Sequence, residues 1–299
     1  MSAPRVAILT VTTNAAAHLG AYFDALEEVT YPAWSLTVVD NASSDGSAEI
    51  VRSRLPAATL IENETNLGFT GACNRALEAL RDDPDIEYVL FLNDDTEVTP
   101  SFLEPLVEAA VSGDLLVAPK TYLAGTDGLL DDSAGDFDWW RGAWKRGVLG
   151  VPATFDADRP RQIDNANLSC LLVPRQALHD VGLLDDAFFV YYDDTDFCRR
   201  AATAGYRIFY EPRSVVYHRK GATLGGQMSA FGCYYLARNR PYLMRKHLTF
   251  PRFAAFWVYF LGTRAARCAL WAIHGRFDLV RATGAGIRDF LLRRMGPRR

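Results

Sequence analysis

The 299-residue sequence predicts an α/β fold in which helices flank a sheet and a basic helical region follows. Three observations predict it. Strand-like and helix-like runs alternate through the first half, as in a parallel sheet built from βαβ units. A second block of strand and helix patterns occupies about residues 167–220. From about residue 231 the pattern is helical and rich in arginine.

Each element of the first half follows from its own pattern. Short runs rich in β-branched and apolar residues predict strands over residues 5–13, 35–42, 58–64 and 87–95. Amphipathic runs between them predict helices over residues 17–29, 48–55 and 73–83. In such sheets ligands bind beyond the carboxyl ends of the strands. We therefore expect Asp40, Asn66 and the acids after residues 91–93 along one crevice.

The stretch 121–160 interrupts this alternation. It has little periodicity and carries Trp139, Trp140 and Trp144, so it predicts a long excursion, which in compact domains is usually functional or disordered. Regular patterns then resume. They predict a strand running into a helix over residues 167–178, a helix over 193–204 and strands over 206–212 and 215–220.

Charge is distributed unevenly along the chain. Residues 238–299 contain fourteen Lys and Arg but two Asp and Glu, whereas the other 237 residues have a balance of −16. The apolar run 253–261 is well short of the roughly 20 residues that cross a bilayer. Bulky apolar residues interleaved with arginines predict interfacial helices on an anionic membrane. The alternative is a helical subdomain that packs on the core and exposes an arginine face.

A nucleic-acid partner and an oxidising compartment are both disfavoured. An arginine-rich segment also suits nucleic acid, but the negative remainder would repel phosphates, so we expect no nucleic-acid partner. The five cysteines are odd in number and form no CxxC pair, which favours a reduced cytosolic protein. The first residues do not read as a signal peptide. We expect a cytoplasmic protein, peripheral at the inner face of the membrane.

The first concentration of carboxylates lies in FLNDDTEV, residues 91–98. Mg²⁺ and Mn²⁺ prefer oxygen ligands, often one or two carboxylates together with substrate phosphates. One interpretation places Asp95 on the metal of a nucleotide diphosphate and Asp94 on the ribose. The other makes the pair a polar strand end that caps the next helix. An aspartyl-phosphate phosphatase would need an aspartate at Asn93, so we reject that class.

The second concentration is YYDDTDFCRR, residues 191–200, which places Asp193, Asp194 and Asp196 behind an apolar run. These acids are candidates for a metal site, a catalytic base or the polar start of a helix.

Three further positions are candidates for binding. Asp40 ends a strand, where it can accept a hydrogen bond from the imide N–H of uracil or thymine. Gly68 and Gly71 precede a helix and permit either close backbone approach to a ligand or a tight turn. His218 is a candidate metal ligand, although a lone histidine is more often structural.

Five separated motifs occur in one order: VVDNASSDGS, NLGFTGACN, FLNDD, NLSCLLVPRQALHDVGLLDDAFFVYYDDTDFCRRAATAGYRI and VVYH. Over about residues 4–247 this set resembles the family 2 glycosyltransferases, in particular the rhamnosyltransferase-like branch of bacterial surface-polysaccharide assembly. The resemblance implies a GT-A fold with a Rossmann-like, nucleotide-sugar-binding mixed sheet. It also implies a divalent metal, Mg²⁺ or Mn²⁺, and inversion at the anomeric carbon.

We expect a catalytic domain over residues 1–230, with a nucleotide-sugar-binding half (1–120) and an acceptor-side half (121–230), and a helical region over 231–299. The resemblance assigns donor binding to Thr13, Asp40, Asn66, Gly68 and Asp94, and the metal to Asp95 and His218. It makes Asp194 the general base, beside Asp193, which replaces the family's usual glutamate and has a shorter reach.

Other positions carry weaker implications. Asp196 falls in the first turn of a helix, where its charge suits the dipole, and we assign it no chemistry. Asn167-Leu168-Ser169-Cys170 stands where the family commonly has Ser-Gly-Ala, which leaves the acceptor open. The three tryptophans are candidates for acceptor stacking or for lining a membrane-facing lip, with hydrophobic packing of the long loop as the alternative.

The expected function is therefore inverting transfer of a hexose or deoxyhexose to a hydroxyl of a glycan or lipid-linked glycan. L-Rhamnose from dTDP-rhamnose is favoured, and a UDP-sugar is the alternative donor. A noncatalytic nucleotide-sugar-binding or polysaccharide-binding module is the rival. It predicts loss of the carboxylates, yet Asp40, Asp94, Asp95 and Asp194 are all present. The sequence leaves the oligomeric state open.

Overall fold

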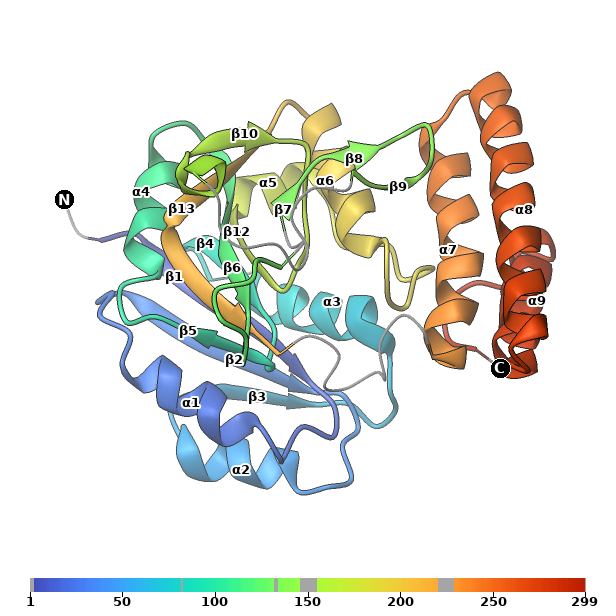
Figure 1. Ribbon diagram of the computed structural model, residues 1–299. Helices are drawn as coiled ribbons and strands as arrows, with labels where there is room; N and C mark the ends of the chain where they lie inside the picture. Colours follow the sequence, from blue (N-terminus) through green and yellow to red (C-terminus); the bar gives the residue numbers. More distant parts are fainter. Residues whose placement is uncertain (1–2, 82, 132–133, 146–154, 220–228, 299) are drawn as a thin grey trace.

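The structure is a computed structural model that describes residues 3–81, 83–131, 134–145, 155–219 and 229–298. Its centre is a nine-stranded sheet in the order β10-β13-β6-β12-β4-β1-β2-β3, with β5 paired to β13 (Figure 1). The strands are β1 Arg5–Thr12, β2 Trp34–Asp40, β3 Thr59–Glu62, β4 Ile86–Leu92, β5 Thr96–Val98, β6 Leu115–Leu123, β10 Arg161–Ile163, β12 Cys170–Pro174 and β13 Arg207–His218.

The direction of the strands decides where their polar ends meet. Strands β1, β2, β3 and β4 are parallel, as the alternating pattern predicts. Strand β12 is antiparallel to both β4 and β6, and β13 runs parallel to β6. The sheet is therefore mixed. The carboxyl ends of β1, β2, β4 and β13 share one edge, where β12 begins.

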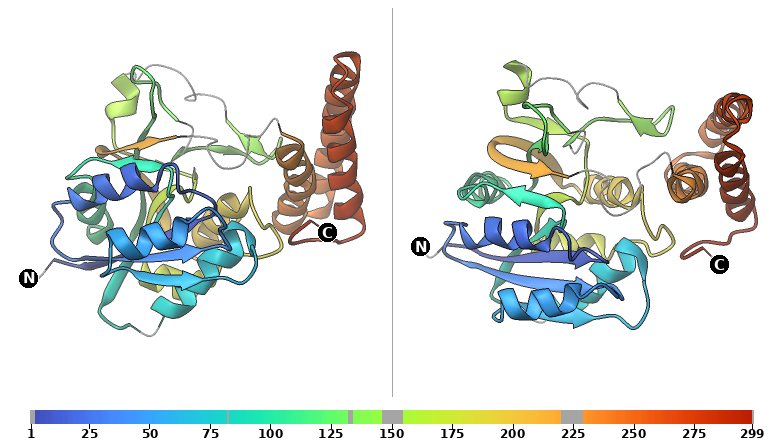
Figure 2. Two further views of the ribbon diagram at one scale, coloured as in Figure 1. Left: turned by 90° about the horizontal axis from the view of Figure 1, so that it is seen from below. Right: turned by 60° about the horizontal axis from the view of Figure 1, so that its bottom comes forward.

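Helices cover both faces of this sheet (Figure 2). In β1, Val6 and Ile8 face the apolar core beneath α1, α2 and α4, whereas Ala7 and Leu9 face the core beneath α3, α5 and α6. A strand buried on both faces needs apolar residues at successive positions, which explains its continuous apolar run. The helices are α1 Leu19–Glu27, α2 Ser47–Arg54, α3 Gly68–Leu80, α4 Leu103–Val111, α5 Arg175–Val181 and α6 Asp193–Thr203.

Three further helices form a layer beside the sheet: α7 Ala230–His247, α8 Phe250–Ile273 and α9 Phe277–Leu291. Helix α7 lies between the rest of the protein and the pair α8 and α9 (Figure 2). The layer shares an apolar cluster with the rest of the protein, in which Phe137 and Phe188 pack with Met244 and Phe256. The domain boundary at residue 230 stays a prediction.

Three local expectations need correction. The two strands predicted over 206–212 and 215–220 are one strand, β13, whose register shifts between Glu211 and Val215. Helix α3 begins at Gly68 rather than at residue 73. The stretch 121–160 contains short elements: β7 Ala134–Gly135, β8 Phe137–Asp138, β9 Ala143–Trp144 and the 3₁₀ helix Phe155–Asp158; β7 pairs with β11 Asn165–Ala166. Residues 146–154 lie outside the described residues.

The basic C-terminal segment is less exposed than its composition suggests. Arg238 is fully buried and Arg240 is 8% exposed, so neither contributes its charge to an outer surface. Within the described part of the chain, no helix is both long enough and apolar enough to span a bilayer.

Candidate active site

A cleft of about 1130 Å³ opens at the shared carboxyl edge of the strands and continues between that edge and helices α7, α8 and α9. It brings together nine of the residues that the sequence predicts for the site: Thr13, Asn66, Gly68, Asp94, Asp95, Trp144, Asp193, Asp194 and His218. Asp40, Trp139 and Trp140 are not part of its lining. Segments far apart in the sequence therefore converge because several strands end at one place.

Asp95 and His218 meet at the ends of β4 and β13. The Nε2 atom of His218 lies 3.2 Å from Oδ1 of Asp95, and its Nδ1 atom lies 2.7 Å from Oδ2 of Asp131. Burial alone would lower the pKa of His218, but hydrogen bonds to Asp131 and Asp95 outweigh it and raise that pKa to about 9. No sequence pattern indicated Asp131, which is 87 residues away from His218.

The pair fits a divalent cation that is shared with a ligand. Oδ1 of Asp95 is buried, and apart from its 3.2 Å contact with Nε2 of His218 it has no partner in the described structure. The carboxylate of Asp131 fixes the ring of His218 as second carboxylates do for metal-bound histidines. Among the described residues no group of three or more His, Cys, Asp and Glu is placed to hold a metal. Among the described residues, Asp95 and His218 are thus the candidate ligands, and further oxygens would come from a bound molecule, as is common for Mg²⁺.

Asp94 has a different neighbour. Its Oδ1 atom lies 3.6 Å from Nε2 of His18, the residue that precedes α1. Burial raises the pKa of Asp94, and the interaction with His18 opposes that rise. The interaction with Asp94 in turn raises the pKa of His18. Sequence patterns did not indicate His18, because the contact exists only once β1 and β4 are paired.

The loops that follow β2 and β3 are joined to each other by side-chain hydrogen bonds. Asn41 donates from Nδ2 to Oδ1 of Asn66 at 3.0 Å, and Asn66 accepts from the backbone N–H of Gly68 at 2.8 Å. Asp40 is buried and accepts from the N–H of Ser43 through one oxygen, whereas its Oδ1 atom has no partner in the described structure. An unpartnered buried carboxylate oxygen is costly, which is expected where a ligand supplies the donor.

Asp193 and Asp194 begin helix α6 and line the cleft. Oδ1 of Asp194 accepts the backbone N–H of Thr195 at 2.6 Å. Asp193 is buried, and burial followed by the charge of Asp194 raises the pKa of Asp193 well above its ordinary value. The chain reaches these acids through a strained loop in which Phe189, Tyr191 and Tyr192 have φ angles of 67°, 64° and 69°. Such conformations cluster at functional sites.

The backbone at Gly68 is approached closely by another part of the protein, Phe189. A Cβ atom there would lie 2.3 Å from Cδ2 of Phe189, and the residue has a φ of +74°. The neighbouring N–H of Phe69 donates to the carbonyl oxygen of Phe189 at 2.8 Å. The start of α3 and the strained loop therefore support each other.

Helix α7 holds the same loop from the other side. Asn239 is fully buried and donates from Nδ2 to the carbonyl oxygens of Phe188, Val190 and Tyr191 at 2.9, 2.7 and 3.2 Å. Arg238 donates to the carbonyl oxygen of Phe188 at 2.9 Å. No sequence pattern indicated this role for Asn239 or Arg238.

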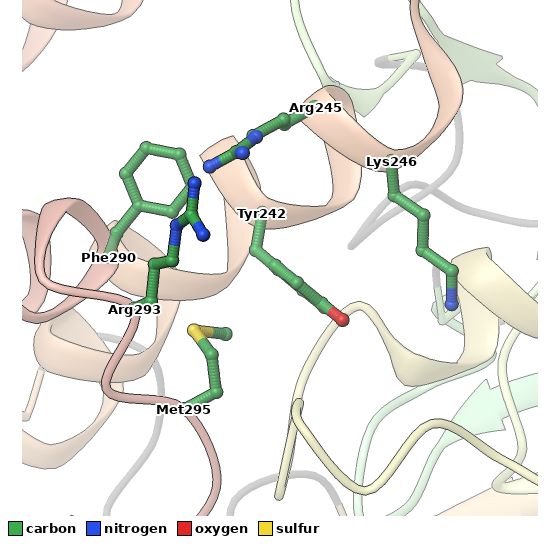
Figure 3. A pocket seen from close by; sticks show the side chains of 6 residues that line it. All are labelled: Tyr242, Arg245, Lys246, Phe290, Arg293 and Met295. Atoms are coloured by element: carbon green, nitrogen blue, oxygen red, sulfur yellow. The ribbon is translucent and has the colours of Figure 1, made fainter.

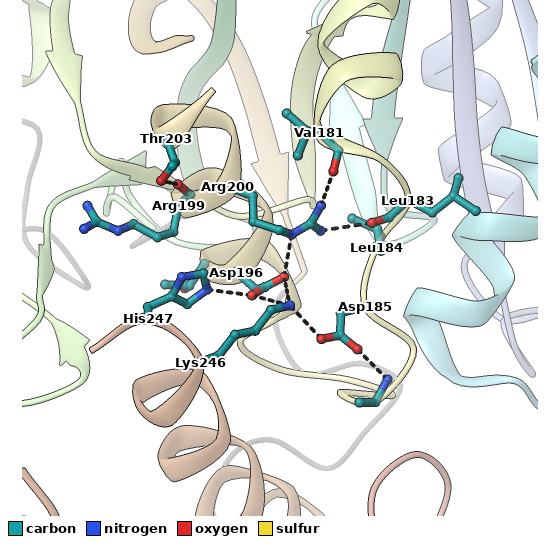
Figure 4. Close-up of polar contacts among 12 residues, drawn as sticks. Val181, Leu183, Leu184, Asp185, Asp196, Arg199, Arg200, Thr203, Lys246 and His247 are labelled. Carbon is teal, nitrogen blue, oxygen red and sulfur yellow. Dashed lines mark hydrogen bonds and ion pairs between the residues drawn. The ribbon is translucent and has the colours of Figure 1, made fainter. Parts of the chain in front are cut away.

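Asp196 lies apart from the cleft lining and takes part in a buried ion-pair network (Figure 4). It contacts Nε of Arg200 at 2.8 Å, Nζ of Lys246 at 2.9 Å and Nε2 of His247 at 2.7 Å. Burial would raise the pKa of Asp196, but hydrogen bonds to His247 and Lys246 prevail and lower it to about 2. Its role thus extends beyond the helix dipole, because it links α6 to α7.

The three tryptophans do not act as one surface. Trp144 lines the cleft. Trp139 packs against Phe137 and His247, with the guanidinium of Arg199 4.9 Å from its ring centroid. Trp140 is 68% exposed. Acceptor stacking is therefore retained as a proposal for Trp144 alone.

A smaller hollow of about 340 Å³ lies between the end of α7 and the residues around the end of α9 (Figure 3). It shares no lining residue with the cleft. Its Lys246 contacts Asp185 and Asp196, so this side chain takes part in a structural network.

Comparison with known proteins agrees with this geometry. Residues 7–154 match the model of the family described as glycosyl transferase family 2. The chain is 27% identical over 240 residues to an N-acetylglucosaminyl-diphospho-decaprenol L-rhamnosyltransferase of Mycobacterium tuberculosis, a match that covers 73% of this chain and 77% of that protein.

Solved structures share the fold. A mannosyltransferase, PcManGT from Pyrobaculum calidifontis, solved with GDP-Man and Mn²⁺, superposes with a TM-score of 0.63 at 17% identity, covering 98% of this chain and 89% of that chain. GalNAc-T7, solved with UDP, GalNAc and Mn²⁺, gives a TM-score of 0.58 at 16% identity over 79% of this chain, which spans about half (48%) of that one. Residues 7–154 are thus a glycosyl transferase family 2 domain, and the protein is a glycosyltransferase of GT-A fold that is similar to rhamnosyltransferases.

Proposed function

We propose that the protein transfers a hexose or deoxyhexose from a nucleoside diphosphate sugar to a hydroxyl of a glycan or lipid-linked glycan. L-Rhamnose from dTDP-rhamnose is the favoured donor, in keeping with the similarity to a rhamnosyltransferase. One observation carries the proposal. Asp94 and Asp95 on one side, and Asp193 and Asp194 on the other, line a single cleft.

The chemistry assigned to the second pair is proton removal. Asp194 lies at the N-terminus of an eleven-residue helix, whose dipole favours a negative charge there. Asp193 has a raised pKa and retains its proton more readily, which leaves Asp194 as the base. Asp194 takes the proton of the acceptor hydroxyl as the new C–O bond forms at the anomeric carbon. The bond from that carbon to the diphosphate breaks on the opposite face, so the configuration inverts.

Residues at the strand ends are assigned to the donor. Asp95 and His218 would hold a divalent metal, Mg²⁺ or Mn²⁺, which when bound stabilises the charge of the leaving diphosphate. Asp94 would bind the ribose. Asn66, Gly68 and Thr13 form the nearby walls of the cleft.

Asp40 lies outside the cleft lining, next to Asn41, which is part of it, and we keep its assignment to the nucleotide base from the resemblance. Its unpartnered Oδ1 atom would accept the imide N–H that uracil and thymine both carry, so this residue does not distinguish dTDP-sugars from UDP-sugars.

A panel of nucleotide sugars tests the donor. The panel contains dTDP-rhamnose, UDP-glucose, UDP-N-acetylglucosamine and GDP-mannose, each with Mg²⁺, with Mn²⁺ or with a chelator. We expect dTDP-rhamnose with metal to give the largest thermal stabilisation and slow hydrolysis of the sugar. Asp95→Asn should remove the metal-dependent part, and Asp127→Asn, on an exposed turn, should not. Stabilisation with neither hydrolysis of the donor nor transfer to any acceptor would favour the noncatalytic binding module.

We also propose that the protein works at an anionic membrane surface, on its cytoplasmic side. Helix α8 exposes Val258 at 74% and Ile273 at 79%. The exposed residues that continue this face of α8 carry no charge: Ala254, Ala255, Leu261, Gly262, Ala265 and Ala269. An uncharged helix face beside many arginines is typical of interfacial helices.

A further inference from the structure

The cleft has a second wall that lies beyond the residues matched by the family model. Helix α7 supplies Phe231, Leu236 and Arg240 to this wall, and helix α8 supplies Arg264, Ala266, Arg267, Leu270 and Trp271. It thus combines three arginines with apolar and aromatic side chains, and carries no carboxylate of its own.

Two of these arginines have no compensating acid in the described part of the chain: Arg240, which is buried, and Arg264, which is partly buried. Arg240 is 8% exposed, and it donates through Nε to the backbone carbonyl oxygen of Arg141 at 3.1 Å. The Nε atom of Arg264 is buried and has no hydrogen-bond partner in the described structure. No carboxylate among the described residues forms an ion pair with either side chain. Charges away from water are normally paired, so these two side chains are suited to bind an anionic ligand.

The two guanidinium groups contact the same aromatic ring. That of Arg240 lies 5.6 Å, and that of Arg264 5.8 Å, from the ring centroid of Phe260. Burial, and then the like charge of Arg240, lower the pKa of Arg264. Arg267 stacks over Trp271 at 5.5 Å and completes the group. The repulsion among these cations would be relieved by a ligand with more than one negative charge.

Tyr192 connects this group to the proposed base. Burial raises the pKa of Tyr192; the nearby charges of Arg240 and Arg264 oppose that rise, and the charge of Asp194 adds to it. Tyr192 therefore lies within electrostatic reach of both the arginines and Asp194, and it directly precedes helix α6.

We propose that Arg240, Arg264 and Arg267 bind the diphosphate of a lipid-linked acceptor, with Phe231, Leu236, Leu270 and Trp271 contacting the start of its hydrocarbon chain. The proposal rests on the proposed glycosyl transfer and names the class of acceptor. Inversion requires the acceptor and the departing nucleotide diphosphate to occupy opposite faces of the sugar. An acceptor diphosphate is thus expected on the α7 and α8 wall, away from Asp95 and His218 at the strand ends.

The apolar side chains explain why the anion should carry a lipid. Leu270 is 53% exposed within the cleft lining, and Ile273 and Phe277 continue toward solvent at 79% and 54% exposure. A chain that leaves the cleft along these residues reaches the uncharged outer face of α8. The geometry connects the arginine group with the surface that we assign to the membrane.

Binding of geranyl diphosphate tests the proposal independently of transfer. Without metal or donor, geranyl diphosphate should stabilise the protein more than geraniol or inorganic diphosphate does, and Arg264→Gln should weaken its binding about 10- to 100-fold. Arg252→Gln, an exposed arginine on the same helix, should bind like the wild type. Equal binding by wild type and Arg264→Gln would overturn the proposal.

Stability separates a binding role from a structural one. Arg264→Gln removes a repelled cation and should leave Tm unchanged or raised, whereas a structural arginine would lower it. Arg264→Lys should recover part of the affinity, because it restores the charge without the planar fork. A lowered Tm in Arg264→Gln with no recovery in Arg264→Lys would contradict the assignment.

Kinetics separate the possible sources of the diphosphate. In Arg264→Gln, the KM for a short-chain prenyl-diphosphate-linked sugar acceptor should rise at least tenfold while the KM for the donor stays constant. A raised donor KM would assign the arginines to the nucleotide instead. Loss of vesicle binding with an unchanged acceptor KM would assign them to membrane headgroups. If wild type binds geranyl diphosphate but transfers no sugar, the proposed function fails and this site stands.

Discussion

At residue 68, a side chain would meet the backbone that leads to Asp193 and Asp194. A Cβ atom would lie 2.5 Å from the carbonyl oxygen of Phe189, a group that cannot move away without shifting the loop. Gly46 also has a positive φ, of +90°, but a Cβ atom at that position would have nothing within 4 Å. Comparing substitutions at the two glycines therefore distinguishes the cost of backbone strain from the cost of a steric clash.

We predict that Gly46→Ala costs about 1 kcal/mol of stability from the left-handed conformation alone. Gly68→Ala should cost a further ~1–3 kcal/mol, because the added methyl group overfills its site. Chemical denaturation measures both. Gly68→Ala should also lower kcat, since it displaces the loop before Asp194. Equal costs at the two positions would show that the contact with Phe189 is unimportant.

Candidate site residues could be predicted from the sequence where the neighbouring residues mark them. Asp94, Asp95, Asp193 and Asp194 could be chosen because each follows a strand or begins a helix in the sequence. His18, Asp131 and Asn239 could not, because their partners are remote along the chain. Asp131 pairs with His218 at a separation of 87 residues, and Asn239 bonds to Phe188 at a separation of 51. Only the completed sheet and helix packing bring these groups together.

At the scale of elements, α6 and α7 are joined by Asp196. Its pKa of about 2 lies below the ordinary value of 3.8, so the folded protein binds this proton less readily than the unfolded chain. The resulting stability is fully present above about pH 4 and is lost as the pH falls through about 2. It amounts to on the order of 2 kcal/mol.

We predict that Asp196→Asn lowers the free energy of unfolding by about 3–5 kcal/mol at pH 7, because it leaves Arg200, Lys246 and His247 around an uncharged group. The difference from wild type should shrink between pH 4 and pH 2. Urea denaturation across that range measures it. A difference that stays constant with pH would mean that the ionised carboxylate is not what links α6 to α7.

Asn239 gives a second prediction for α7. Asn239→Asp keeps the shape but replaces two N–H donors by an oxygen that faces three carbonyl oxygens. We expect a loss of several kcal/mol in stability, since a buried group is left unsatisfied and charged. At temperatures where the variant is folded, kcat should fall more than the KM of the donor rises. A change in donor KM alone would place the effect on the nucleotide side.

Periodicity predicted most elements but not how they join. Strands β1, β2 and β4 were recognisable because continuous apolar runs suit burial on both faces. Strand β13 was divided in two because Pro212 and Arg213 interrupt its pattern. The structure accommodates them at the register shift between Glu211 and Val215, which is where proline is tolerated in strands.

For the molecule as a whole, the C-terminal helices connect the cleft to a surface. Composition predicted a basic helical region, but it could not separate the buried Arg238 and Arg240 from surface arginines, because burial depends on how α7 packs. The face of α8 that exposes Val258 and Ile273 is uncharged. We therefore expect membrane attachment to combine apolar insertion with attraction by the arginines that remain outside.

Flotation with vesicles tests this attachment. The protein should bind vesicles that contain anionic lipid, should bind neutral ones weakly, and should be released in part by salt. Val258→Glu with Ile273→Glu should reduce binding at least tenfold. Val111→Glu, at an equally apolar exposed position on α4, should not. Binding that is indifferent to the α8 substitutions would assign this face to another partner.

The most direct test of the account concerns Asp194. Asp194→Asn keeps the shape and removes the base, and general-base catalysis contributes about 10²- to 10⁴-fold. With dTDP-rhamnose, or whichever donor the panel selects, we predict that transfer falls by at least 100-fold while thermal stabilisation by donor and metal is unchanged. In the wild type, NMR of the product should show an inverted anomeric centre. Transfer by Asp194→Asn within tenfold of wild type would contradict the account.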